Sequence, residues 1–291
     1  MSFPKHVHAT SATPHKAVAM SITDGLSPAD SALLAATTLA VQAAGAQLKS
    51  RFSLGAPGLK TLADVVHAID ANDAAALTAM RAPLLAARPG ALWADDELAG
   101  GELPPGEWWV TDPVEGNINH IHGMADWCVT ATLVRDNQLV LTVVDVPLTG
   151  ETYLAMRGHG AWCNGVRLRA SGKTTLNAAL VATGQAAPGE SSETQRRLVK
   201  SIAAMLKAGL VLRAAVPSTW QLMHVAAGRM DVFWQFSQVR SGLVAGALLV
   251  EEAGGVVSDA RGRPWTLGSD NLVAAAPGVH AASVDVLRSI P

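Results

Sequence analysis

The sequence predicts an α/β (α+β) chain of two packed subdomains, residues 28–183 and 184–291. Two long segments with a helical apolar period open the first part, and several strand-like segments follow them. After a polar stretch at 184–192, helix-like and strand-like segments alternate, which is typical of an α/β subdomain. A chain of 291 residues with 49% apolar residues can bury a core of this size.

In the first part we expect helices at 28–49 and 61–87. The first opens at Pro28, and an Arg88-Pro89-Gly90 turn ends the second. Strands are expected at 108–111, 127–135, 139–146, 152–156 and 161–163. The second and third of these form a hairpin, because Asp136-Asn137 is a pair that two-residue turns favour.

In the second part the alternation predicts three helices and four strands. The helices are expected at 194–208, 218–227 and 243–253, and the strands at 211–215, 231–235, 256–259 and 272–275.

Charge and composition exclude several classes of protein. The net charge is -2 and there is no run of Lys or Arg, which argues against partners such as nucleic acid or a membrane surface. No stretch reaches the roughly 18 uninterrupted apolar residues of a membrane helix. Residues 1–27 lack the apolar core of a secretory signal, so we expect a flexible leader in a cytoplasmic protein. Cys128 and Cys163 lie in apolar segments and are expected to be reduced thiols rather than a disulfide or a metal pair.

The most informative segment is the acidic loop, residues 112–116 (Asp-Pro-Val-Glu-Gly). A strand delivers Asp112 to its end, and Glu115 follows closely on the other side of a turn stiffened by Pro113. Gly116 allows a tight backbone turn. Two carboxylates and the main-chain carbonyl of Val114 are the hard oxygen ligands that Mg²⁺ prefers. A surface turn that happens to carry two acids is the alternative.

The acidic loop resembles the signature of the inositol monophosphatase family, an aromatic strand followed by Asp-Pro-Ile-Asp-Gly-Thr-Thr-Asn. Residues 64–70, 157–165 and 245–259 are similar to three further motifs of that family, in the family's order. The resemblance implies a layered α/β/α/β/α sandwich of the sugar-phosphatase type, usually a homodimer. It also implies Mg²⁺-dependent hydrolysis of a small phosphate monoester, in which metal ions activate water and bind phosphate oxygens.

The resemblance assigns four metal ligands, the side chains of Asp95, Asp112 and Glu115 and the carbonyl of Val114. Asp95 stands where the family has a glutamate, and the neighbouring Asp96 is a possible substitute. Glu115 stands where the family has an aspartate, so its carboxylate is moved by one methylene.

The residues expected to activate water also depart from the family pattern. Asp70 matches the acid that works with a threonine, but Asn117 replaces that threonine. An amide can hold a water but cannot relay a proton as readily as a hydroxyl. His120 replaces an aromatic residue and is a candidate base near neutral pH, with plain packing as the alternative.

The far end of the site departs further. Ser241 and Gly242 stand where the family has Trp-Asp, so one carboxylate ligand is missing and the affinity for Mg²⁺ should fall. Arg240 either faces solvent or takes over part of the charge neutralisation of a phosphate. Gln235 replaces an acidic contact to a sugar hydroxyl, which makes ordinary inositol phosphates poor candidates. The expected substrate contacts are Gly116, Asn117, Gln235 and Arg240.

Three hypotheses follow from these departures. The first is a divergent Mg²⁺-dependent phosphatase of a small phosphorylated metabolite. The second is a protein that keeps the fold but has lost hydrolysis and acts as a binding module. The third is an enzyme of different chemistry that uses His120, Glu115 or Asp70 as acid and base in the same pocket.

Overall fold

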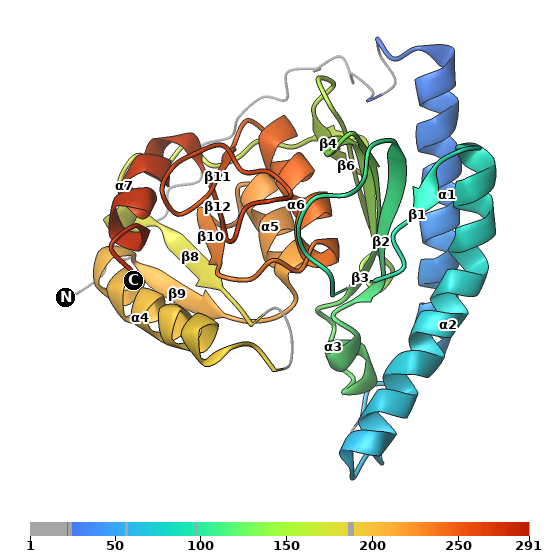
Figure 1. Ribbon diagram of the computed structural model, residues 1–291, viewed down its shortest axis with the longest axis horizontal. Helices are drawn as coiled ribbons and strands as arrows, with labels where there is room; N and C mark the ends of the chain where they lie inside the picture. Colours follow the sequence, from blue (N-terminus) through green and yellow to red (C-terminus); the bar gives the residue numbers. More distant parts are fainter. Residues whose placement is uncertain (1–21, 23–24, 56–57, 97, 186–188, 291) are drawn as a thin grey trace, which may run out of the picture.

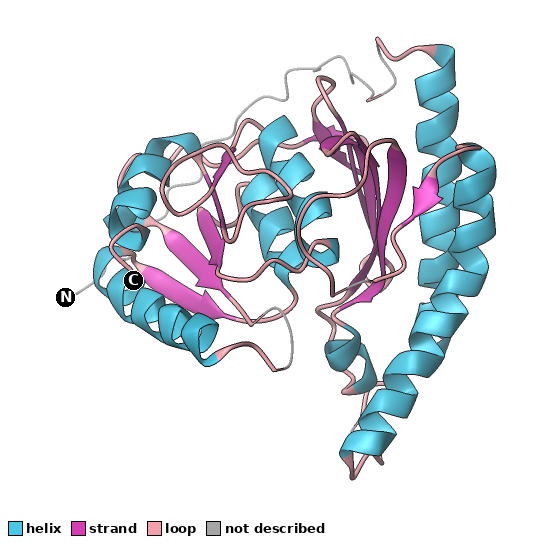
Figure 2. Ribbon diagram, viewed as in Figure 1, coloured by secondary structure: helices cyan, strands magenta, loops and turns pink. Residues whose placement is uncertain are grey.

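The computed structural model describes residues 22, 25–55, 58–96, 98–185 and 189–290. The leader predicted at 1–27 therefore lies, except for residues 22 and 25–27, outside the described residues. Five layers follow one another, a helix pair, a sheet, a second helix pair, a second sheet and an outer helix pair (Figures 1 and 2). The predicted α/β/α/β/α sandwich is confirmed.

The first layer consists of α1 (Pro28–Arg51) and α2 (Leu62–Ala87). Both helices begin at side-chain caps, which satisfy backbone N–H groups that have no partner inside the helix. Ser27 accepts from the N–H of Asp30, while Thr61 and Asp64 form a reciprocal capping box. By length and composition α1 could cross a membrane, and it is the only such helix in the described part of the chain. Its buried face packs on β3 and β4.

The seven-stranded sheet follows the chain order from β1 to β7. Its pairs are antiparallel except β1 with β2, which are parallel. Asp136 and Asn137 both have positive φ, as the predicted hairpin turn between β3 and β4 requires. The strands are β1 (Leu92–Trp93), β2 (Glu107–Glu115), β3 (Cys128–Arg135), β4 (Gln138–Val146), β5 (Glu151–Met156), β6 (Ala161–Cys163) and β7 (Val166–Arg167).

The middle layer consists of α5 (Ser218–Ala226) and α6 (Ser241–Glu252), which lie between the two sheets (Figure 1). Residues 241–250 of α6 are all buried, because a sheet covers the helix on each side. An apolar helix without a polar face fits only such an interior position. The first turn of α6 also reaches the end of β2, where the acidic loop lies.

The five-stranded sheet has the order β11-β12-β10-β8-β9 and is covered on its outer face by α4 (Ser192–Ala208) and α7 (Pro277–Leu287). Strands β9, β8 and β10 are parallel, and β12 runs against β10 and β11. The strands are β8 (Leu180–Thr183), β9 (Val211–Ala214), β10 (Val232–Gln235), β11 (Val256–Ser258) and β12 (Leu272–Ala275).

Several short elements were not predicted from the sequence. They are β1, β7, β8, the 3₁₀ turn η1 (Leu176–Ala178), α3 (Asn117–Ile121) and α7. Because β8 belongs to the second sheet, that sheet begins four residues before the position at which we expect the second subdomain. The division into subdomains stays a prediction. Both cysteines are free thiols, Cys128 buried and Cys163 half-buried.

Candidate functional site at the acidic loop

The acidic loop is the end of β2 and not a surface turn. Asp112 pairs with Thr130 of β3, and Glu115 pairs with Cys128, so two residues of β2 lie opposite one residue of β3 between these pairs. This is a β-bulge, and Pro113 falls within it, where a residue without an N–H is tolerated. The bulge bends the strand and directs both carboxylates inward, where they are buried.

Gly116 ends the loop in the left-handed region, with φ of 88°. A Cβ at this position would lie 2.8 Å from the carbonyl oxygen of Asp126 and 2.9 Å from Cγ of Pro217. Both the backbone angle and the packing therefore require glycine here. The turn leads directly into α3, which starts at Asn117.

Asp112 is only 4% exposed. Its Oδ1 accepts a 3.2 Å hydrogen bond from the N–H of Val114, and its Oδ2 accepts a long, 3.5 Å hydrogen bond from the hydroxyl of Ser241. Ser241, at the position of the expected tryptophan, thus links the loop to the first turn of α6.

Glu115 is 7% exposed, and its Oε1 accepts a 2.9 Å hydrogen bond from the N–H of Thr219 in the first turn of α5. That helix has no side-chain cap of its own, so Glu115 supplies the capping carboxylate from another element. A Cβ at Gly242 would lie 3.5 Å from both carboxylate oxygens of Glu115. A Cβ at this position would therefore be in ordinary van der Waals contact with this carboxylate, and glycine places no side chain beside it.

The carboxylates of Asp112 and Glu115 both lie close to Cys128 and to the first turn of α6. Burial raises the pKa of the Cys128 thiol, and the negative charges of Glu115 and Asp112 raise this pKa further. Ser241 and Gly242, adjacent residues in α6, are the points that Asp112 and Glu115 reach. The loop thus presents two buried acids to one helix turn.

Asp95 lies apart from this pair. Its side chain is 73% exposed and forms a 2.9 Å ion pair with Arg81 on α2. Asp96 is exposed as well. The structure does not bring the predicted ligand Asp95 together with Asp112 and Glu115, because its carboxylate lies on the surface and is paired with Arg81.

Asn117 contacts Asp73 rather than the predicted Asp70. Its Nδ2 donates to Asp73 Oδ1 at 2.7 Å and to the carbonyl of Ile69 at 3.2 Å, and its Oδ1 accepts from Asn72 at 3.0 Å. Both donor hydrogens of the amide are therefore used by α2. Asp70, one helical turn before Asp73, is exposed. The amide of Asn117 thus holds the Asp73 carboxylate by a hydrogen bond.

Asp73 is a half-buried acid. Burial raises its pKa to about 6, the hydrogen bond from Asn117 lowers it, and the nearby charge of Asp70 raises it. A carboxyl group that titrates near 6 can exchange a proton at neutral pH, which the amide of Asn117 cannot do.

His120 is buried, and both ring nitrogens are hydrogen-bonded. Nε2 lies 3.0 Å from the carbonyl of Leu48, and Nδ1 lies 3.0 Å from Nδ2 of Asn72. The neutral tautomer with a proton on Nε2 satisfies both contacts. The ring also packs edge-on against Phe52 and Trp127, and burial lowers its pKa. These contacts favour the packing alternative, because the lone pair on Nδ1 already accepts a hydrogen bond from Asn72.

Arg240 and Gln235 are both buried, but they face different surroundings. The Arg240 guanidinium donates to the carbonyls of Gly100 and Gly101, at 2.7 and 3.1 Å. These two hydrogen bonds hold the segment that precedes β2. The Arg240 side chain neither faces solvent nor reaches the loop acids in any contact that the structure describes. Gln235 Oε1 accepts from the hydroxyl of Ser218, at the start of α5.

Comparison with known proteins places this site in a family. The model of the inositol monophosphatase family matches residues 29–289. The chain belongs to this family. It is 32% identical to the inositol-1-monophosphatase of Rhizobium meliloti, over 80% of this chain and 86% of that protein. It is 37% identical to the Nus factor SuhB of Pseudomonas aeruginosa, but there the match spans only 57% of this chain and 61% of the relative.

Solved structures of inositol monophosphatase family members share the fold. The inositol monophosphatase of Anabaena superposes with a TM-score of 0.73 at 23% identity, covering 90% of this chain and 97% of that one. The suhB extragenic suppressor protein of Bartonella henselae has a TM-score of 0.73 at 26% identity, covering 90% of this chain and 99% of that one. Relatives thus include proteins named as phosphatases and proteins named as a factor or a suppressor.

The inositol monophosphatase family is in general Mg²⁺-dependent, so the fit of this site to a metal can be tested on its ligands. Among the described residues, no three His, Cys, Asp or Glu side chains gather closely enough to hold an ion. Asp112 and Glu115 remain, with Gly242, which has no side chain, beside Glu115. They fit one cation that completes its shell with water and substrate oxygens, and they do not fit a second ion, which would need the missing aspartate.

The contacts of four residues at this site were not predicted from the sequence, those of Asn72, Asp73, Thr219 and Ser241. Asn72 and Asp73 carried a usable signal, because Asp73 lies three residues after Asp70 and shares its helix face. Thr219 and Ser241 contact the loop through a backbone N–H and a long hydroxyl contact, and no sequence pattern reports either.

Proposed function

We propose that the chain is a divergent phosphatase that hydrolyses a phosphate monoester of a small metabolite and binds one divalent cation together with its substrate. The observation that carries this proposal is the pair of buried carboxylates, Asp112 and Glu115, that lie against the first turn of α6, where Gly242 has no side chain. Two buried acids repel a phosphate unless a cation lies between them and it. A single Mg²⁺ tolerates two protein carboxylates when phosphate and water fill the remaining positions.

In this proposal Asp112, Glu115 and the carbonyl of Val114 hold the cation. When bound, the cation neutralises phosphate charge and polarises its oxygens. Asp73 accepts a proton from the attacking water, since its pKa of about 6 leaves it ionised at neutral pH. Asn117 holds the Asp73 carboxylate in place.

The direct test measures phosphate release from a panel of sugar, nucleotide and amino-acid phosphates, with MgCl₂ or with EDTA. We expect Mg²⁺-dependent release that Glu115→Gln abolishes. Asp95→Asn is the matched control, because Asp95 is exposed and bound to Arg81. We expect it to release phosphate at the rate of the unmodified chain. No release from any substrate by a folded protein would refute the proposal.

The second candidate function is a binding module that keeps the fold without hydrolysis. The observation that favours it is the hydrogen bond from the Thr219 N–H to Glu115, which gives this carboxylate a structural role. Under this alternative, Asp112→Asn would leave the biological role intact. Nothing about His120 favours the third hypothesis, since both of its ring nitrogens are occupied by Leu48 and Asn72.

The remaining expectations stay predictions. These are a homodimer, a cytoplasmic location, and no binding to nucleic acid or membranes. Sedimentation equilibrium of the full chain tests the first of them.

A further inference from the structure

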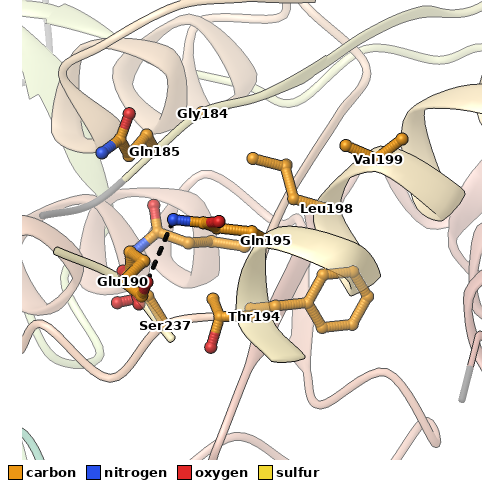
Figure 3. A pocket seen from close by; sticks show the side chains of 10 residues that line it. Gly184, Gln185, Glu190, Thr194, Gln195, Leu198, Val199 and Ser237 are labelled. Carbon is orange, nitrogen blue, oxygen red and sulfur yellow. Dashed lines mark hydrogen bonds between the residues drawn. The ribbon is translucent and has the colours of Figure 1, made fainter. Parts of the chain in front are cut away.

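A cavity of about 230 Å³ lies at the carboxyl ends of the parallel strands β8 and β10, under the first turns of α4 (Figure 3). Ligands of open α/β sheets commonly bind at this edge. The cavity is smaller than the pockets of roughly 300–1,000 Å³ that hold drug-sized ligands, so it suits a small group.

The floor of the cavity contains a buried hydrogen-bond donor that has no partner. Gln235, the last residue of β10, is 1% exposed. Its Oε1 accepts from Ser218, but its Nε2 has no partner among the residues that the structure describes. Native proteins rarely leave a buried amide donor unpaired, so this atom points to a ligand that offers an acceptor.

A carboxylate lies at another wall of the cavity. Oε1 of Glu190 is buried and has no hydrogen-bond partner in the described part of the chain. Its backbone carbonyl accepts from Nε2 of Gln195 at 3.1 Å, which fixes this residue to the start of α4 (Figure 3). A buried carboxylate oxygen requires a donor or a cation. None of the described residues that line the cavity is Lys or Arg, so a cationic partner for this oxygen would come from the ligand.

The other side of the cavity is apolar, formed by Leu198, Val199 and Phe236. Arg197, which does not line the cavity, packs on the ring of Phe236. The central carbon of its guanidinium lies 4.3 Å from the centroid of the ring. A polyol, which carries hydroxyls around its whole surface, would leave hydroxyls unpaired against this wall. A ligand with one apolar face would not.

The cavity adjoins the acidic loop through one side chain. Gln235 turns its amide oxygen toward Ser218, and the Cβ of Ser218 lies 3.8 Å from the position of a Cβ at Gly242. That position is 3.5 Å from the Glu115 oxygens. A substrate with its phosphate at the loop would therefore extend its organic part past Ser218 toward Gln235.

We propose that this cavity binds the leaving group of the substrate, and that this group carries a primary ammonium for Glu190, an acceptor for Gln235 and an apolar face. This inference rests on the proposed function for the identity of the phosphate end, but not for the ligand class of the cavity. The cavity combines one carboxylate, that of Glu190, with amide and hydroxyl side chains and an apolar wall, and a polyol would not match that wall.

The test titrates the full chain with benzylamine, its neutral analogue benzyl alcohol and its anionic analogue benzoate, followed by NMR. We expect benzylamine to bind at least about tenfold more tightly than benzyl alcohol, with shifts at the Gln235 side-chain amide and the Leu198 methyl groups. Glu190→Gln should abolish the preference for the amine. Glu193→Gln removes the same charge from the exposed start of α4 and should retain it.

Equal binding of the three probes by the unmodified chain, or an unchanged preference in Glu190→Gln, would overturn the inference. Phosphate release is measured on the same samples. Its absence together with selective amine binding would refute the hydrolase proposal and leave the ligand class of the cavity standing. Release of phosphate without a preference for the amine would support the hydrolase proposal and refute the ligand class proposed for the cavity.

Discussion

The backbone N–H of Thr219 donates a 2.9 Å hydrogen bond to Oε1 of Glu115, so an acid of the loop is also the cap of α5. One carboxylate thus belongs both to the candidate metal site and to the packing of the middle layer. A substitution at position 115 can therefore change both the stability of α5 and the chemistry of the loop. Two different substitutions of Glu115 distinguish these effects.

Glu115→Ala should lower the free energy of unfolding by about 2 kcal/mol, because the buried N–H of Thr219 loses its acceptor. Glu115→Gln retains an acceptor oxygen and is the matched control, with a loss of less than half that size expected. Urea unfolding followed by circular dichroism measures both. Equal stability of Glu115→Ala and the unmodified chain would show that the cap contributes nothing.

Gly242→Asp should restore a carboxylate beside Glu115 and increase the response to metal. Without Mg²⁺ the variant should melt below Gly242→Asn, its uncharged control, because the new Cβ lies 3.5 Å from both Glu115 oxygens and the charges repel. With Mg²⁺ the order should reverse, by about 1.4 kcal/mol for each tenfold gain in affinity. Melting curves at increasing MgCl₂ measure this. The same Mg²⁺ response in both variants would exclude a cation at this position.

Much of the fold could be predicted because its long elements carry local signals. The helix caps at Ser27 and Thr61 and the turn at Asp136-Asn137 each depend on residues that are neighbours in the sequence. Strand β8 has only four residues, and its place in the second sheet depends on pairing with strands that come later in the chain. That pairing leaves no periodic signal to read.

The site was predictable to a smaller extent. Asp112 and Glu115 could be found because one short loop carries both. The choice of Asp73 over Asp70 depends on how α2 packs against Asn117, and that packing is a tertiary contact. The guanidinium of Arg240 donates to the carbonyl of Gly100, which is 140 positions away in the chain. The orientation of this side chain could therefore not be predicted from residues near it in the sequence.

Asp73→Asn should flatten the pH dependence of stability. Burial raises the folded-state pKa of Asp73 to about 6 from 3.8, so the stability contribution of the protonated acid is fully present below pH 3.8 and lost as the pH rises through 6. Allowing for partial exposure, we expect the variant to be about 1–2 kcal/mol more stable relative to the unmodified chain at pH 7 than at pH 3.8. Asn keeps an acceptor for Asn117.

The measurement compares urea unfolding of both proteins between pH 3.5 and 7.5, a window set to bracket the two pKa values. Asp145, whose pKa burial also raises to about 6, is present in both chains, so its contribution cancels in the difference. A difference that does not change with pH would mean that Asp73 titrates at its ordinary pKa.

His120→Phe separates packing from catalysis. Phenylalanine retains the ring contacts with Phe52 and Trp127, but it leaves the carbonyl of Leu48 without its donor. It also removes one of the two acceptors of the Asn72 amide, which still donates to Asn117. We expect a loss of about 2 kcal/mol in unfolding free energy from these buried groups. We expect no change in phosphate release per folded molecule, since His120 has no free nitrogen for proton transfer. A folded but inactive His120→Phe variant would instead make His120 an acid or base, as the third hypothesis requires.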